Sequence, residues 1–134
     1  MTIVVPNAGE VVNLSYFVGK TASTENVKYQ LFATNITPAE TDTAGTYTIA
    51  TGGGYADITL TGSSWTVTGG APTSASYAQQ TWTFTGTLTT NPTIYGYIVV
   101  GATTGTLFWA ESFTSFTPAN NGDNIKITPA LTAE

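Results

Sequence analysis

Apolar and polar residues alternate with a period of two along much of this chain. In residues 78–85, Gln80, Trp82 and Phe84 fall on one face, and Gln79 and a run of threonines fall on the other. Such alternation indicates strands with one buried face, and the abundant Thr, Tyr, Val, Ile and Phe suit that surface. No stretch of a dozen residues places Ala, Leu, Glu or Lys at helical spacing. The pattern therefore predicts an all-β fold.

Turn signals rich in Gly, Pro, Asn and Asp divide this pattern into eight or nine short strands. The predicted strands are residues 10–18, 26–34, 46–50, 55–61, 64–68, 78–85, 93–100, 106–113 and 124–128. Residues 35–44 and 69–74 are predicted loops, and residues 101–105 form a predicted hairpin loop. Strands of this number and spacing predict a two-sheet antiparallel sandwich. A jelly roll is the first interpretation and an immunoglobulin-like sandwich is the alternative.

The first nine residues are predicted to form an extended arm, followed by a single β-sandwich domain over residues 10–134. Ile3, Val4 and Val5 make an apolar triplet, and Pro6 separates it from the first predicted strand. Two interpretations stay open. The triplet adds as a strand to the sheet edge of a neighbouring subunit, or it is an edge strand within its own domain.

The charged and reactive residues narrow the range of functions. The 134 residues include no Cys, His or Arg, and three lysines against eight acidic residues give a net charge of −5. This composition excludes Cys/His metal sites, thiol chemistry and serine–histidine triads. It also provides no basic surface for phosphates, so we expect no nucleic-acid partner. We expect a protein that is not an enzyme and that has no cofactor and no metal.

Nothing in the sequence indicates export or membrane insertion. The N-terminal residues lack a positive segment followed by a long apolar run, so no signal peptide is expected. The longest apolar runs, such as residues 98–100, are far too short to span a bilayer. We expect synthesis in the cytoplasm and no membrane partner.

Glu111 is the most conspicuous candidate for chemistry, because it lies in an otherwise apolar predicted strand beside Trp109. Period-two alternation places Trp109 and Glu111 on the same face as Leu107, with Phe108 on the opposite face. A carboxyl group beside an indole is a candidate for a tuned acid. The alternative is an exposed or interface residue with a hydrogen-bonded partner, and we favour that alternative.

Two loop motifs have structural explanations, and a third stays open. Gly52, Gly53 and Gly54 predict a flexible turn, since no helix follows them and no lysine is placed for a phosphate. Asp123 lies in a segment with the composition of a calcium loop but not its spacing, which favours a turn capped by the Asp side chain. Glu40 and Asp42 lie two residues apart in a predicted loop, so weak cation binding there stays open.

The aromatic residues have two interpretations. Trp65, Trp82 and Trp109 either stack on sugar rings from an exposed face or fill the space between two sheets. Trp82 alternates with threonines, as core residues do. Tyrosines are favoured in subunit contacts. The predicted interface residues are Ile3, Val4, Val5, Tyr95, Tyr97 and Trp109, with Tyr16 as a further tyrosine candidate.

Several sequence blocks, in order, resemble a small family of virion structural proteins of tailed bacteriophages. The most specific blocks lie in the C-terminal third, and the blocks of the N-terminal half fit more loosely. They are residues 4–10, 31–38, 47–48, 95–100, 101–105, 107–113 and 121–132. The resemblance implies a non-enzymatic particle component, and the form that we expect is a decoration or cement protein on the outer face of the capsid. It carries no catalytic residues.

The resemblance also implies the partners and the location. We expect contacts with copies of the chain itself and with a major capsid protein lattice, in a virion, at the head surface. A carbohydrate-binding or receptor-binding module of a tail or fibre is the alternative, and a hydrolase that uses Glu111 is the least favoured hypothesis. Few charges and dense β-structure suit tight packing of copies against one another.

Overall fold

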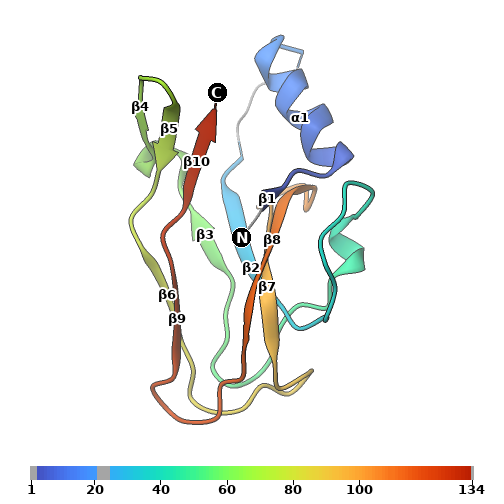
Figure 1. Cartoon of the computed structure of the whole chain (residues 1–134), viewed down its shortest axis with the longest axis vertical. Helices are drawn as coiled ribbons and strands as arrows, with labels where there is room; N and C mark the ends of the chain where they lie inside the picture. Colours follow the sequence, from blue (N-terminus) through green and yellow to red (C-terminus); the bar gives the residue numbers. More distant parts are fainter. Residues whose placement is uncertain (1–2, 21–24, 134) are drawn as a thin grey trace.

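The computed structural model describes residues 3–20 and 25–133 and confirms the all-β prediction (Figure 1). The described residues contain ten strands, one α-helix and two short 3-10 helices. The strands are β1 (Ile3–Val4), β2 (Val27–Phe32), β3 (Ile58–Leu60), β4 (Thr66–Thr68), β5 (Thr73–Ser76), β6 (Gln80–Thr83), β7 (Ile94–Gly101), β8 (Leu107–Phe116), β9 (Asn124–Ile127) and β10 (Ala130–Ala133). The helices are α1 (Asn7–Phe17), η1 (Ala44–Thr46) and η2 (Gly62–Ser64).

The strands pair antiparallel in three groups. A five-stranded sheet has the order β1-β8-β7-β2-β3, a three-stranded sheet has the order β10-β5-β4, and β6 pairs with β9. In Figure 1 the three-stranded sheet lies above the β6–β9 pair along the left side, and both face the five-stranded sheet. The predicted sandwich-like arrangement is therefore confirmed, with the hairpin of β7 and β8 in the middle of the larger sheet.

The core lies between these layers. Its buried residues come from both sides and are Tyr29, Leu31, Ala50, Leu60, Trp82, Phe84, Leu88, Ile94, Tyr97, Val99, Phe108 and Trp109. Trp82 and Phe84 take the core positions that their alternation with threonines predicts. A second cluster, which includes Phe32 and Ile98, lies on the other face of the five-stranded sheet, where Tyr47 and Ile49 help to cover it. Both faces of the central strands are therefore buried.

The prediction of a strand over residues 10–18 is wrong, because this segment forms α1. Pro6 precedes the helix, and Gly19 follows it with a φ of 71°. The Gly19 N–H donates to Tyr16 O and the Lys20 N–H donates to Ser15 O. These two bonds form a Schellman motif, which ends a helix at a left-handed glycine. A proline before the first turn and a glycine after the last are thus the local signals that outweigh the β-branched residues inside.

Three shorter predictions also differ from the structure. Residues 46–50 contain only an isolated bridge between Ile49 and Phe32, where a strand was predicted. Strand β5 begins inside the predicted loop 69–74, and β10 follows Pro129, which was expected to end the last strand. Both strands consist largely of small or polar residues and gain their order by pairing with each other, Ala130 opposite Ser76. Such long-range pairing leaves little local pattern in the sequence.

A β-bulge in β8 changes the faces predicted around Glu111. Val99 pairs with Trp109 and the next residue, Val100, pairs with Leu107, so Phe108 is an extra residue in β8. As a result, Phe108 and Trp109 both pack in the core between the layers, and Leu107 packs on the opposite face. The period-two prediction that Leu107 shares a face with Trp109 is therefore wrong.

Candidate functional site

Glu111 is the one acidic side chain in the described part of the chain that is buried, at 8% exposed. Strand β8 places it between two neighbouring strands, with Ile3 of β1 and Tyr97 of β7 as its register partners. The Tyr97 hydroxyl donates a hydrogen bond to Glu111 Oε2. The hydrogen-bonded partner expected for Glu111 is confirmed, whereas the expectation of an exposed side chain is wrong because Glu111 is buried in the single chain.

Aromatic rings pack beside this carboxyl group. The rings of Tyr29 and Tyr97 stack with centroids 5.2 Å apart and planes at 18°. Trp109 meets Tyr29 edge to face at 6.0 Å and 83°. The Trp109 Nε1 is buried and has no hydrogen-bond partner among the described residues. The carboxyl group thus lies in a largely apolar environment, where each polar contact counts strongly.

Burial raises the pKa of the Tyr97 hydroxyl well above its usual value, and the hydrogen bond to Glu111 and the charge of that carboxylate raise it further. Burial also raises the pKa of Tyr29, and the charge of Glu111 adds to this effect. Both hydroxyls therefore stay protonated at neutral pH. Tyr97 is a fixed hydrogen-bond donor to Glu111 and not a base.

Glu111 and Tyr97 line a pocket of about 480 Å³, which we call the Glu111 pocket. It lies between β8 on one side and β9 with the start of β10 on the other. Its remaining lining residues are Ile3, Phe113, Thr114, Phe116, Ile125, Lys126, Ile127, Thr128 and Ala130. Glu111 is the single acidic residue in this described lining, whereas most glycosidases need a pair of carboxyl groups. The described lining therefore holds no carboxylate pair of the kind that most glycosidases use.

A second feature is the solvent-facing side of α1. Gly9 and Val12 face inward: Gly9 is buried against β8, and Val12 packs on the core. The opposite side exposes Val11, Leu14 and Phe17, and Val18, which caps the end of the helix, is exposed next to them; we call these four large apolar residues the outer face of α1. Phe17 is 89% exposed. A helix that is apolar on both sides is normally covered on both.

Sequence reasoning missed this surface because it assigned residues 10–18 to a strand. Val11, Leu14 and Val18 have the spacing i, i+3, i+7 of one helix face, and Phe17 lies beside them. Pro6 before this segment and Gly19 after it are the signals that would have indicated a helix. On a helix, the spacing of Val11, Leu14 and Val18 predicts one apolar face.

The predicted interface residues do not form one exposed surface. Ile3 and Val4 form β1 at the edge of the chain's own sheet, which agrees with the second of the two interpretations left open for the arm. Tyr97 and Trp109 are 5% and 8% exposed, so in this structure their side chains contact other parts of the same chain. The three remaining predictions of subunit contact concern partly buried residues, Val5, Tyr95 and Tyr16, and stay predictions.

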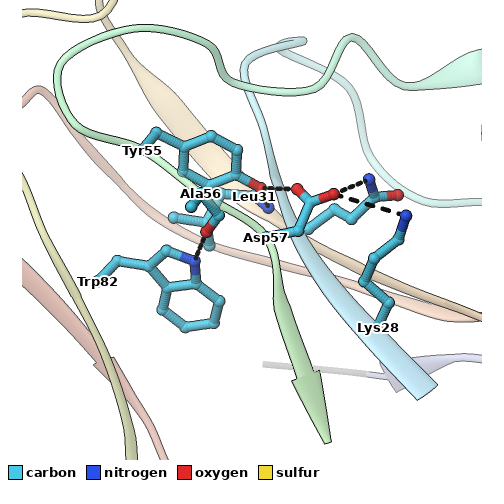
Figure 2. Close-up of polar contacts among 7 residues, drawn as sticks. Lys28, Leu31, Tyr55, Ala56, Asp57 and Trp82 are labelled. Atoms are coloured by element: carbon cyan, nitrogen blue, oxygen red, sulfur yellow. Dashed lines mark hydrogen bonds and ion pairs between the residues drawn. The ribbon is translucent and has the colours of Figure 1, made fainter. Parts of the chain in front are cut away.

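Asp57 organises a polar network on the outside of β2 (Figure 2). Its carboxylate accepts hydrogen bonds from the Tyr55 hydroxyl and from Gln30 Nε2, both at 2.8 Å, and lies 3.6 Å from Lys28 Nζ. The Tyr55 hydroxyl in turn accepts the Leu31 N–H, and Trp82 Nε1 donates to Ala56 O at 3.0 Å. These bonds fasten residues 55–57 to β2 and β6, so the role of Asp57 is structural.

Two further acidic residues, Asp123 and Asp42, accept hydrogen bonds from the backbone of their own loops. Asp123 accepts the Ala119 and Asn120 N–H groups at 2.8 Å, which lowers its pKa and confirms the predicted turn. Asp42 accepts the Ala39 N–H and the Tyr47 hydroxyl. Within the described ranges, no group of three or more acidic side chains comes together as a metal site. Cation binding at Glu40 and Asp42 therefore has no support beyond the sequence.

A groove of about 310 Å³ lies between α1 and the three-stranded sheet. Tyr16 and Trp65 line it, together with Phe108 and Trp109 and the polar residues Asn13, Glu25 and Asn26. Glu25 is already occupied, because its carboxylate accepts the Thr103 and Thr104 N–H groups. Trp65 is partly exposed and is the tryptophan best placed to meet a ligand.

No helix among the described residues is both long and apolar enough to cross a membrane. Comparison of the chain with protein-family models, with curated proteins and with solved structures finds no match. The resemblance to virion structural proteins therefore rests on the sequence blocks alone.

Proposed function

We propose that this chain is a structural protein of a bacteriophage virion, a decoration or cement protein that stabilises the head by adhering to copies of itself and to the capsid lattice. The observation that carries the proposal is the outer face of α1. Its four large apolar residues face solvent in the single chain. Burial of one such side chain stabilises a contact by about 1.5–3 kcal/mol.

The anchoring of α1 supports this role. An ideal Cβ at Gly9 would lie 2.2 Å from the Phe108 carbonyl oxygen, so the helix backbone sits directly on β8. The helix end is fixed by the bonds to Gly19 and Lys20. A rigidly held apolar surface loses little conformational entropy on binding, which favours tight association. The sparse charge of the chain, 8% of residues, also suits close packing between copies.

The proposal is tested on particles. Virions of the phage that encodes the chain are purified and their proteins identified by mass spectrometry. The variant Leu14→Gln/Phe17→Gln keeps good helix formers in α1 but removes apolar surface. We expect the wild-type chain on the particles and a large loss of occupancy for the variant.

The control is Val67→Thr, which changes an apolar residue on β4 that is 69% exposed and lies outside α1. We expect this variant to occupy particles as the wild-type chain does. Absence of the wild-type chain from purified particles, or equal occupancy of the double variant, contradicts the proposal.

A second candidate function is a carbohydrate-binding or receptor-binding module. The observation that favours it is the groove in which the partly exposed Trp65 lies near the amides of Asn13 and Asn26. Aromatic faces with neighbouring amides suit sugar rings. A glycan array with the wild-type chain and Trp65→Ala separates the two functions, because only this candidate requires sugar binding that depends on the indole.

A further inference from the structure

The Glu111 pocket holds a carboxylate that lacks a cationic partner among the described residues. The chain has three lysines and no arginine. Within the described part of the chain the one ion pair joins Lys28 to Asp57, and Lys126 lines the pocket without forming an ion pair with Glu111. A buried carboxylate is costly unless a cation or several donors satisfy it. The Glu111 carboxylate therefore offers a point of attachment for a positive group from outside.

The hydrogen bonding of Glu111 restricts what that group is. Tyr97 donates to Oε2, and the described residues provide no hydrogen bond to Oε1. A guanidinium group binds a carboxylate best through both oxygens at once, whereas an ammonium group acts as a point charge and needs only one. An anion placed against Glu111 would be repelled by its carboxylate, and Lys126 is the one cationic side chain in the described lining. The free oxygen thus favours an ammonium group over a guanidinium group.

The walls of the pocket fit the rest of such a ligand. Ile3, Ile125 and Ile127 supply apolar surface for an alkyl stem, and Phe113 and Phe116 add aromatic rings. Aromatic faces attract cations, and alkyl stems of amines pack on apolar side chains. A volume of about 480 Å³ is in the range of small-molecule sites.

We propose that the Glu111 pocket binds a primary alkylammonium group, with the ammonium on Glu111 Oε1 and the apolar stem against Ile125 and Ile127. Lysine side chains of a partner protein and free alkylamines share this chemistry. The site does not depend on the proposed role in a virion, and it uses a different surface from the outer face of α1.

The test uses the full chain and three probes that share a five-carbon stem: n-pentylamine, n-pentylguanidine and n-pentanol. Binding is followed by shifts of backbone NMR signals of β8 and β9 during titration. We expect saturable binding of n-pentylamine at these strands, with n-pentanol and n-pentylguanidine at least tenfold weaker. Equal affinity for the amine and the alcohol overturns the proposal, because the carboxylate would then contribute nothing.

Variants and a peptide probe complete the test. Glu111→Gln keeps the shape of the side chain and is expected to weaken n-pentylamine binding at least tenfold. The control Asp57→Asn changes an exposed carboxylate outside the pocket and is expected to leave this binding unchanged. If Glu111→Gln fails to fold, the comparison of probes on the wild-type chain still decides. Nα-acetyl-lysine N-methylamide distinguishes a lysine side chain from a free amine as the source of the ammonium group. Stronger binding than n-pentylamine indicates a lysine in a polypeptide, and weaker binding indicates a free amine. No binding of either probe refutes the site.

Discussion

Replacement of Gly9 by alanine tests whether α1 is seated on β8 as the structure has it. In an isolated helix this change is favourable by about 0.8–1 kcal/mol, because alanine is the better helix former. Here the new Cβ would lie 2.2 Å from the Phe108 carbonyl oxygen and 2.9 Å from its carbonyl carbon. Both atoms belong to the backbone of the central hairpin, so they cannot turn aside as a flexible side chain does.

The clash therefore outweighs the gain in helix propensity. Overpacking of this kind costs about 1–3 kcal/mol, and a contact this close to backbone belongs at the upper end of that range. We expect Gly9→Ala to lower the free energy of unfolding by about 1–2 kcal/mol. In thermal unfolding this corresponds to a fall in Tm of roughly 3–10 °C for a domain of this size.

The assay is equilibrium unfolding in urea, followed by circular dichroism and tryptophan fluorescence. Gly45→Ala is the matched control, because the nearest atom to its Cβ is Thr43 Oγ1 at 3.8 Å. We expect that control to change stability by less than about 0.5 kcal/mol. A Gly9→Ala variant as stable as the wild-type chain, or more stable, refutes the seating of α1 on β8.

Three further outcomes are expected. Phe84→Ala removes a fully buried ring and should lower the free energy of unfolding by about 3–5 kcal/mol in urea denaturation; a loss below 1 kcal/mol contradicts the core described. Burial raises the pKa values of Tyr29, Tyr55 and Tyr97 in the folded chain. The protonated hydroxyls therefore contribute fully to the stability of the fold below pH ~10, and this contribution is lost as pH rises above that value. Tyrosinate absorbance that titrates fully near pH 10 without unfolding argues against this burial. Burial opposes ionisation of Glu25, but hydrogen bonds from Thr103 and Thr104 outweigh it and lower the pKa of Glu25. The Glu25 carboxylate therefore stabilises the fold above pH ~4.3, and this contribution is lost as pH falls below that value. If the free energy of unfolding depends on acidic pH in Glu25→Gln as it does in the wild-type chain, the prediction is contradicted.

The fold class is readable from local pattern where strands are long and have one or both faces buried. The alternation around Trp82 and Phe84 is a direct consequence of burial on one side, so those positions are predictable. Strands β5 and β10 are not, because small residues carry no alternation and the pairing of Ala130 with Ser76 joins distant parts of the chain.

The candidate sites were harder to predict, for two physical reasons. Helix α1 contains residues that suit strands. Pro6 and Gly19 mark its two ends, but they do so through backbone conformation, which the pattern of hydrophobic residues does not show. The bulge at Phe108 interrupts the alternation of side chains in β8, so the sequence alone could not show which residues on the two sides of the bulge share a face of the sheet. Glu111 was nevertheless singled out correctly as unusual, since a carboxylate in an apolar strand demands a partner, which is Tyr97.

The most direct test of adhesion through the outer face of α1 is sedimentation velocity over a range of protein concentrations. We expect the wild-type chain to have an average mass above the 14.0 kDa of one chain, rising with concentration. Leu14→Gln/Phe17→Gln should return the mass toward that of one chain, and Val67→Thr should not. A wild-type chain that sediments as a monomer at every concentration, or a double variant that associates as the wild type does, contradicts the account.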